Sequence, residues 1–110
     1  MSTLNDFYEK SKFEFTELEL DKMENEFLEI ISNKFENISE VEFDCGEGSA
    51  ENVFWLTQMN ISINGLDIIV RGDDNGVPVL DIVHDSNILG VYYPKNITDF
   101  KNYINGINIK

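Results

Sequence analysis

The dipeptide Asn64-Gly65 and its flanks constrain the fold of this chain more than any other feature. Asn-Gly is a preferred pair for a two-residue type I′ turn between adjacent antiparallel strands. Apolar side chains occupy alternate positions on both sides of the turn, as in strands with one buried face. Such a turn pairs Ile63 with Leu66, Ile61 with Ile68, Met59 with Val70, Gln58 with Arg71 and Ser62 with Asp67. The sequence therefore predicts a β-hairpin in this register.

The same period of two extends beyond the hairpin in both directions. Predicted strands cover residues 40–45, 53–63, 66–72, 77–84 and 88–93. The strand at 77–84 has apolar residues on both sides, which is typical of a central strand covered on both faces or of an exposed apolar patch. Within it, we expect Asp81 either to be turned outward by a bulge or to be a buried acid paired with Arg71 or a tyrosine hydroxyl.

Helical patterns lie on both sides of these strands. Thr3-Leu4-Asn5-Asp6 favours a short first helix, and Phe13-Glu14-Phe15 is expected to be extended. Thr16 and Glu19 have the spacing of a capping box, which predicts a longer helix to about Asn37. A last helix is expected over residues 97–105. The expected fold is one α+β domain over residues 1–110, with N-terminal helices, an antiparallel β-meander of four to five strands and a short C-terminal helix.

Net charge limits the function classes. The 110 residues include 21 acids and 8 Lys and Arg, a net charge of −13. This charge opposes direct binding to nucleic acid or to an anionic membrane surface, because phosphate groups repel it. No apolar run reaches the ~20 residues that span a bilayer, and no hydrophobic stretch follows Met1. We therefore expect neither a membrane span nor a secretory signal, and predict a cytoplasmic protein.

Side chains with catalytic or metal-binding chemistry are few. The one cysteine, Cys45, excludes an internal disulfide and a multi-cysteine metal site, and the adjacent Asp44 is expected to raise its pKa. The one histidine, His84, lacks the partners that a metal site or a Ser-His relay requires. We accordingly expect no catalytic residue, no metal ion and no cofactor, and a protein that is not an enzyme.

The acids are the candidates for function. A net charge of −13 exceeds the roughly 2–8 that solubility of a small domain requires, and self-repulsion lowers stability. A basic protein partner would favour such a charge, because opposite charges accelerate association. The expected contact acids lie on the solvent-exposed face of the strand at 40–45 and on loops at the ends of the sheet: Glu40, Glu42, Asp44, Glu47, Asp73 and Asp74. Glu26 and Glu29 on the long helix form a competing surface.

In size, acidity and order of elements, the whole chain resembles bacterial toxin-neutralising immunity proteins, of the kind encoded beside contact-dependent growth-inhibition and related polymorphic toxins. The resemblance includes no diagnostic motif. It implies a one-to-one complex with the C-terminal domain of a cognate toxin, often a nuclease, whose basic active site the acids would occlude. Because a soluble anionic protein suits a soluble cationic target, we expect a nuclease rather than a pore-former. Two alternatives stay open: an acidic nucleic-acid mimic that binds a DNA- or RNA-handling protein, and a small ligand-binding domain.

Overall fold

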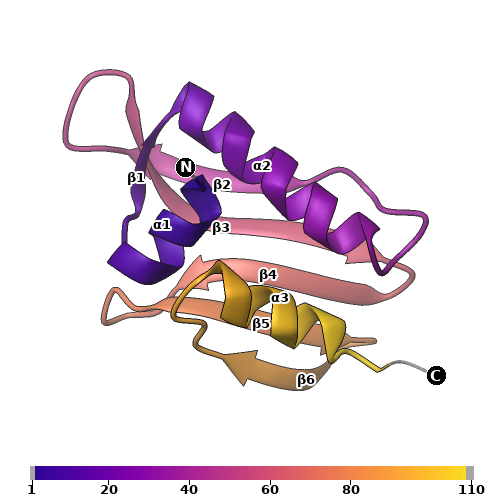
Figure 1. The fold of residues 1–110 in the computed structure, drawn as a ribbon. Helices are drawn as coiled ribbons and strands as arrows, with labels where there is room; N and C mark the ends of the chain where they lie inside the picture. The colour runs from indigo at the N-terminus through magenta and orange to yellow at the C-terminus, as the bar shows by residue number, and fades with distance from the viewer. Residues whose placement is uncertain (1, 109–110) are drawn as a thin grey trace.

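The computed structural model describes residues 2–108, which form an α+β fold with three helices and a six-stranded antiparallel sheet (Figure 1). The elements follow in the order α1 (Thr3–Lys10), β1 (Glu14–Thr16), α2 (Glu17–Ser32), β2 (Glu42–Glu47), β3 (Val53–Ile63), β4 (Leu66–Gly72), β5 (Pro78–His84), β6 (Asn87–Tyr92) and α3 (Ile97–Asn105). The expected fold class is confirmed. The sheet has one strand more than the upper expectation, because the extended segment before α2 pairs as β1.

The hairpin between β3 and β4 forms around Asn64 and Gly65 as predicted. Both residues have positive φ, 48° and 85°, which is the conformation that a type I′ turn requires. Ile63 lies opposite Leu66 and Met59 opposite Val70, and the other predicted pairs of this hairpin are also found. The predicted register is therefore confirmed.

The long strand β3 organises the rest of the sheet. Along one side it pairs with β2, with a register shift between Asp44 and Cys45. Along the other side its first residues, Val53–Trp55, pair with β1, and its second half pairs with β4. The meander continues through β5 to β6. Consequently β2, β6 and the three-residue strand β1 each have one neighbour, and β2 and β6 are the longer outer strands.

Side-chain caps begin the helices. In α2, the backbone N–H of Glu19 donates to Thr16 Oγ1 at 3.3 Å and the N–H of Thr16 donates to Glu19 Oε1 at 3.0 Å, which confirms the predicted capping box. The cap of α1 is Ser2, one residue before the segment expected from the sequence. The cap of α3 is Asn96, whose side chain accepts from the N–H of Asp99.

The prediction that the long helix runs to about Asn37 is wrong, because α2 ends at Ser32. Ser and Asn side chains compete with the helix for backbone hydrogen bonds, and Ser32, Asn33 and Asn37 concentrate that effect here. Asn37 adopts a positive φ of 60°, which a right-handed helix does not contain. Phe35 and Ile38 nevertheless pack against the core, from the connection between α2 and β2.

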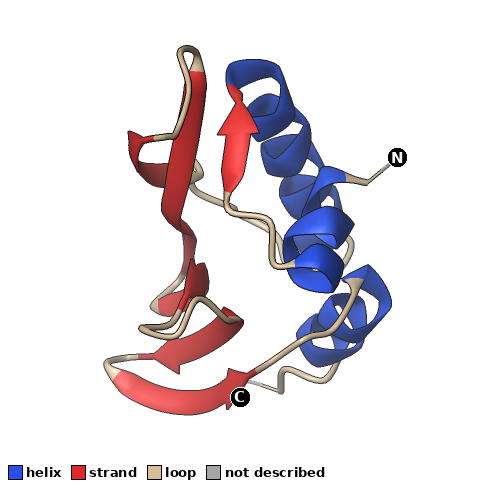
Figure 2. Ribbon diagram, turned by 90° about the vertical axis from the view of Figure 1, so that its left-hand side faces the viewer, coloured by secondary structure: helices blue, strands red, loops and turns tan. Residues whose placement is uncertain are grey.

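All three helices lie on one face of the sheet, as the side view shows (Figure 2). The core between the two layers is rich in aromatic side chains: Phe7, Phe15, Phe27 and Phe100 are fully buried. Leu80 and Ile82 of β5 join this core, whereas Val79 and Val83 belong to the other face, over which no described helix lies. No described helix covers the second face of the strand at 77–84, although Val79 is fully buried there and Val83 is half-buried. Among residues 2–108, no helix is long and apolar enough to cross a membrane.

Candidate partner-binding surface

The sheet face opposite the helices, here called the open face, is assembled from the five strands β2 to β6. Residues that oppose each other on antiparallel strands point to the same side of a sheet. One row across the sheet pairs Glu42 with Asn60, Asn60 with Ile69, Ile69 with Asp81, and Asp81 with Val91. The row changes from acidic at β2 to apolar at β6.

The neighbouring row on the open face shows the same change. It runs from Asp44 through Gln58 and Arg71 to Val79. Asp44 is exposed, whereas Val79 is fully buried even though none of the described helices covers it. Acidic side chains therefore gather along the β2 side of the open face, and apolar side chains along the β5–β6 side.

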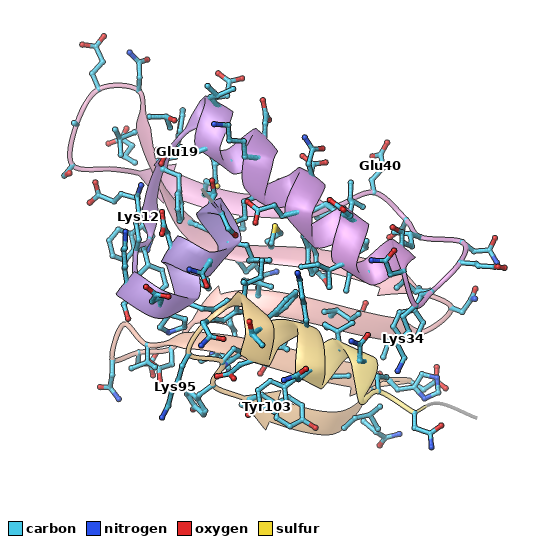
Figure 3. All side chains as sticks on the ribbon, in the orientation of Figure 1. Lys12, Glu19, Lys34, Glu40, Lys95 and Tyr103 are labelled. Carbon is cyan, nitrogen blue, oxygen red and sulfur yellow. The ribbon has the colours of Figure 1, made fainter. Side chains whose placement is uncertain are left out.

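Three of the six expected contact acids lie at this β2 edge. Glu42 and Asp44 are exposed on the open face. Glu40 precedes β2 in the connection from α2, where its side chain points away from the helices into solvent (Figure 3). Together they form what we call the acidic edge, defined by Glu40, Glu42 and Asp44.

The other three expected acids lie elsewhere. Glu47 is on β2, but strand alternation places it on the helix side together with Cys45, which pairs with the buried Leu56. Asp73 and Asp74 lie in the turn between β4 and β5. The Asp73 carboxylate accepts from the backbone N–H groups of Asn75 and Val77, each at 2.9 Å, and so has a structural role in that turn.

The strands contain very little positive charge to offset these acids. Their one Lys or Arg is Arg71, whose guanidinium donates two hydrogen bonds to the Asp81 carboxylate, one of them from Nη2 at 3.2 Å. The hydrogen bond to Asp81 raises the pKa of Arg71. Because Asp81 neutralises its charge, Arg71 does not offset the acids at β2. Asp81 was expected either to be turned outward by a bulge or to be a buried acid with a partner. The structure confirms the second alternative, because Asp81 is mostly buried and paired with Arg71.

All six lysines of residues 2–108 lie outside the strands. Lys10 pairs with Asp6 at 3.4 Å within α1. Lys12, which follows α1, pairs with Glu19 of α2 at 2.7 Å (Figure 3). Glu26, in the competing surface on α2, accepts from the N–H of Thr3 at 2.8 Å and from the Ser2 hydroxyl, so it ties α1 to α2. The acidic edge thus faces solvent without a paired base in the described chain.

Two adjoining hollows lie at the end of the sheet where β2 and β3 meet. They share Asn52 and Phe54, and one extends to Cys45 and Glu47 while the other extends to Leu18 at the start of α2. Partial burial, and secondarily the charge of Asp44, raise the pKa of the Cys45 thiol, in the direction predicted.

Within residues 2–108, no group of three or more His, Cys, Asp and Glu side chains is arranged to hold a metal ion.

The apolar side of the open face corresponds to a choice that the sequence left open, between a strand covered on both faces and an exposed apolar patch. Ile88, Val91 and Tyr93 are 69%, 43% and 52% exposed. The signal for it in the sequence was the apolar pattern on both sides of the strand at 77–84, which does not tell whether a neighbouring element covers that strand.

Comparison of the chain with protein-family models, with curated proteins and with solved structures found no match in any of the three.

Proposed function

We propose that this protein is a cytoplasmic immunity protein, which binds the C-terminal domain of a cognate toxin one-to-one and blocks its active site. The observation that carries the proposal is the unequal distribution of charge. A net charge of −13 is combined with a sheet whose strands hold six acids against one arginine, and that arginine is already paired. A basic, nuclease-like active-site groove is the surface that such a face complements.

In this proposal the acidic edge makes the charged contacts. Glu42 and Asp44 stand on a strand that is hydrogen-bonded to β3, so presenting them to a partner requires little ordering of the backbone. Glu40 extends the same edge towards the α2–β2 connection. The carboxylates would take the place of substrate phosphates in the groove of the toxin. Steering by opposite charge would make association fast and sensitive to salt.

The test uses the C-terminal domain of the protein encoded immediately upstream of this chain's gene. The double variant Glu42→Lys/Asp44→Lys is compared with Asp21→Lys/Glu29→Lys, which makes the same change of charge at two exposed positions on α2. We expect the β2 variant to lower the association rate at least about tenfold and to abolish protection of cells that express the toxin domain, while the α2 variant keeps protection.

The outcomes separate the site from the function. If the α2 variant loses protection and the β2 variant keeps it, the protein is an immunity protein with a different binding surface. If the wild-type chain neither binds the upstream domain nor protects cells from it, the proposed function is wrong. Binding that becomes tighter as salt rises would also contradict the proposal, because charge steering requires the opposite.

A further inference from the structure

The outer strand β6 differs from the outer strand β2 in a way that the proposed function does not use. From Ser86 to Pro94 the chain contains no charged residue. β6 pairs with β5 on one side, and no described residue pairs with its other side (Figure 1). Its side chains include some of the most exposed large apolar groups of the molecule: Ile88, Leu89 and Val91, followed by Tyr93.

Edge strands in soluble proteins are usually protected against pairing with other chains by charged side chains, prolines or bulges. β2 follows this rule, because it carries Glu42, Asp44 and Glu47 and a register shift. In β6 the only such device is a register shift opposite Ile82 and Val83, near the start of the strand. Residues Gly90–Tyr92 pair regularly with β5, which leaves an uncharged, apolar and regular stretch at the edge.

We propose that two copies of this chain associate through β6, antiparallel and related by a two-fold axis, so that their sheets become continuous. Antiparallel pairing of one strand with its own copy satisfies the two-fold symmetry by which most homodimers close. Ile88, Val91 and Tyr93 of each copy then lie against the same residues of the other on the open face, and become shielded from water.

The distribution of charge favours a second copy of the chain as the partner that binds at the β6 edge. In the strand order β2, β3, β4, β5, β6, four spacings of about 4.8 Å place the acidic edge about 19 Å from β6. Pairing through β6 therefore sets the two acidic edges about 40 Å apart, well beyond the Debye length of about 8 Å at physiological ionic strength. Two chains of charge −13 can meet at β6 without bringing these acids together.

A basic partner gains little at this edge, because no acid lies between Ser86 and Pro94. Asp81, opposite Val91 on β5, is already paired with Arg71, and Asp85 lies in the turn before β6. The dimer contact lies at the β6 edge of the sheet and the acidic edge lies at β2, at the other end of the strand order. Each copy therefore keeps its acids free for the partner of the proposed function. The inference does not rest on that function.

The experiment is sedimentation equilibrium of the full chain over a range of concentrations, at about 0.05 M and about 0.5 M sodium chloride. We expect a species of twice 12.7 kDa at high concentration, and a dimerisation constant that strengthens with salt, because screening weakens the repulsion between like-charged copies. Ile88→Lys should weaken dimerisation at least about tenfold, since it places a charge of each copy in an apolar contact that holds no acid to pair with it. Leu18→Lys, at a helix position of similar exposure (66% against 69%), should have no effect.

A chain that is monomeric at every concentration and both salt levels overturns the proposal. A dimer that withstands both Ile88→Lys and Val91→Lys shows that another surface is used, and larger open-ended assemblies show that the two-fold pairing is wrong. Binding of the upstream domain is measured on the same variants. Ile88→Lys should leave it unchanged, and Glu42→Lys/Asp44→Lys should leave dimerisation unchanged, so that the two proposals can fail separately.

Discussion

At the scale of single residues, the hydroxyl of Tyr8 is an unusual group in the core. The side chain stacks against Phe100 at 5.6 Å between ring centroids and meets Phe7 edge to face at 4.9 Å, while its hydroxyl has no hydrogen-bond partner among the described residues. Burial, and then the charge of Asp81, hold the pKa of Tyr8 well above its ordinary value, so the phenol stays neutral.

Tyr8→Phe should therefore raise the free energy of unfolding by about 1 kcal/mol, because it removes a buried donor that forms no bond and keeps the ring contacts. Tyr8→Ala removes the ring as well and should cost about 3–5 kcal/mol. Urea denaturation of both variants measures the two effects. A loss of stability in Tyr8→Phe would show that the hydroxyl is bonded in solution, for instance to a buried water molecule.

At the scale of elements, Arg71 and Asp81 join β4 to β5 among apolar neighbours on the open face. Their side chains are exposed to different extents, 33% for Arg71 and 15% for Asp81. Removing either one leaves the other charge without its partner, and the cost rises with the burial of the charge that remains. Arg71→Met should cost about 2 kcal/mol and Asp81→Leu about 1 kcal/mol, since the arginine reaches water more easily than the carboxylate.

The double variant Arg71→Met/Asp81→Leu separates the interaction energy of the two side chains from the cost of burying a charge without its partner. It leaves no unpaired charge, and should be more stable than Arg71→Met alone. Urea denaturation of the three variants in a double-mutant cycle gives the coupling energy. If the two single costs simply add, the two side chains do not interact, and the open face has an unpaired arginine that the proposed function would have to accommodate.

At the scale of the whole molecule, repulsion among 21 acids should dominate the response to salt. Within residues 2–108 three ion pairs join Lys or Arg to acids, so most carboxylates have no such partner. Screening weakens the repulsion, and the melting midpoint should rise between low and moderate ionic strength. Thermal unfolding of the wild type and of Ile88→Lys tests this, because the variant removes any contribution from dimerisation. A midpoint that falls on adding salt would mean that attractive pairs outweigh repulsion.

Local patterns were sufficient for much of the fold. Asn64-Gly65 and the alternation around it predicted the register of β3 and β4, and Thr16 with Glu19 predicted the start of α2. Each of these features involves residues that are close in the chain, so the residue types alone carry the information. The end of α2 was placed too late, because the apolar stripe continues through Phe35 and Ile38 after the backbone has left the helix.

The tertiary structure alone decided where the strands lie relative to one another. Nothing near Glu14 in the sequence indicates that β1 pairs with the first residues of β3, some forty positions later, or that β2 and β6 become the longer outer strands. The sequence placed Glu42 and Asp44 on one face of a strand that ended at residue 45, and it placed Glu47 in the following loop. In the structure β2 extends to Glu47 and carries it on the other face. Charge and alternation are properties of single segments, whereas an edge exists only where a neighbouring strand is missing, and that depends on the pairing of distant residues.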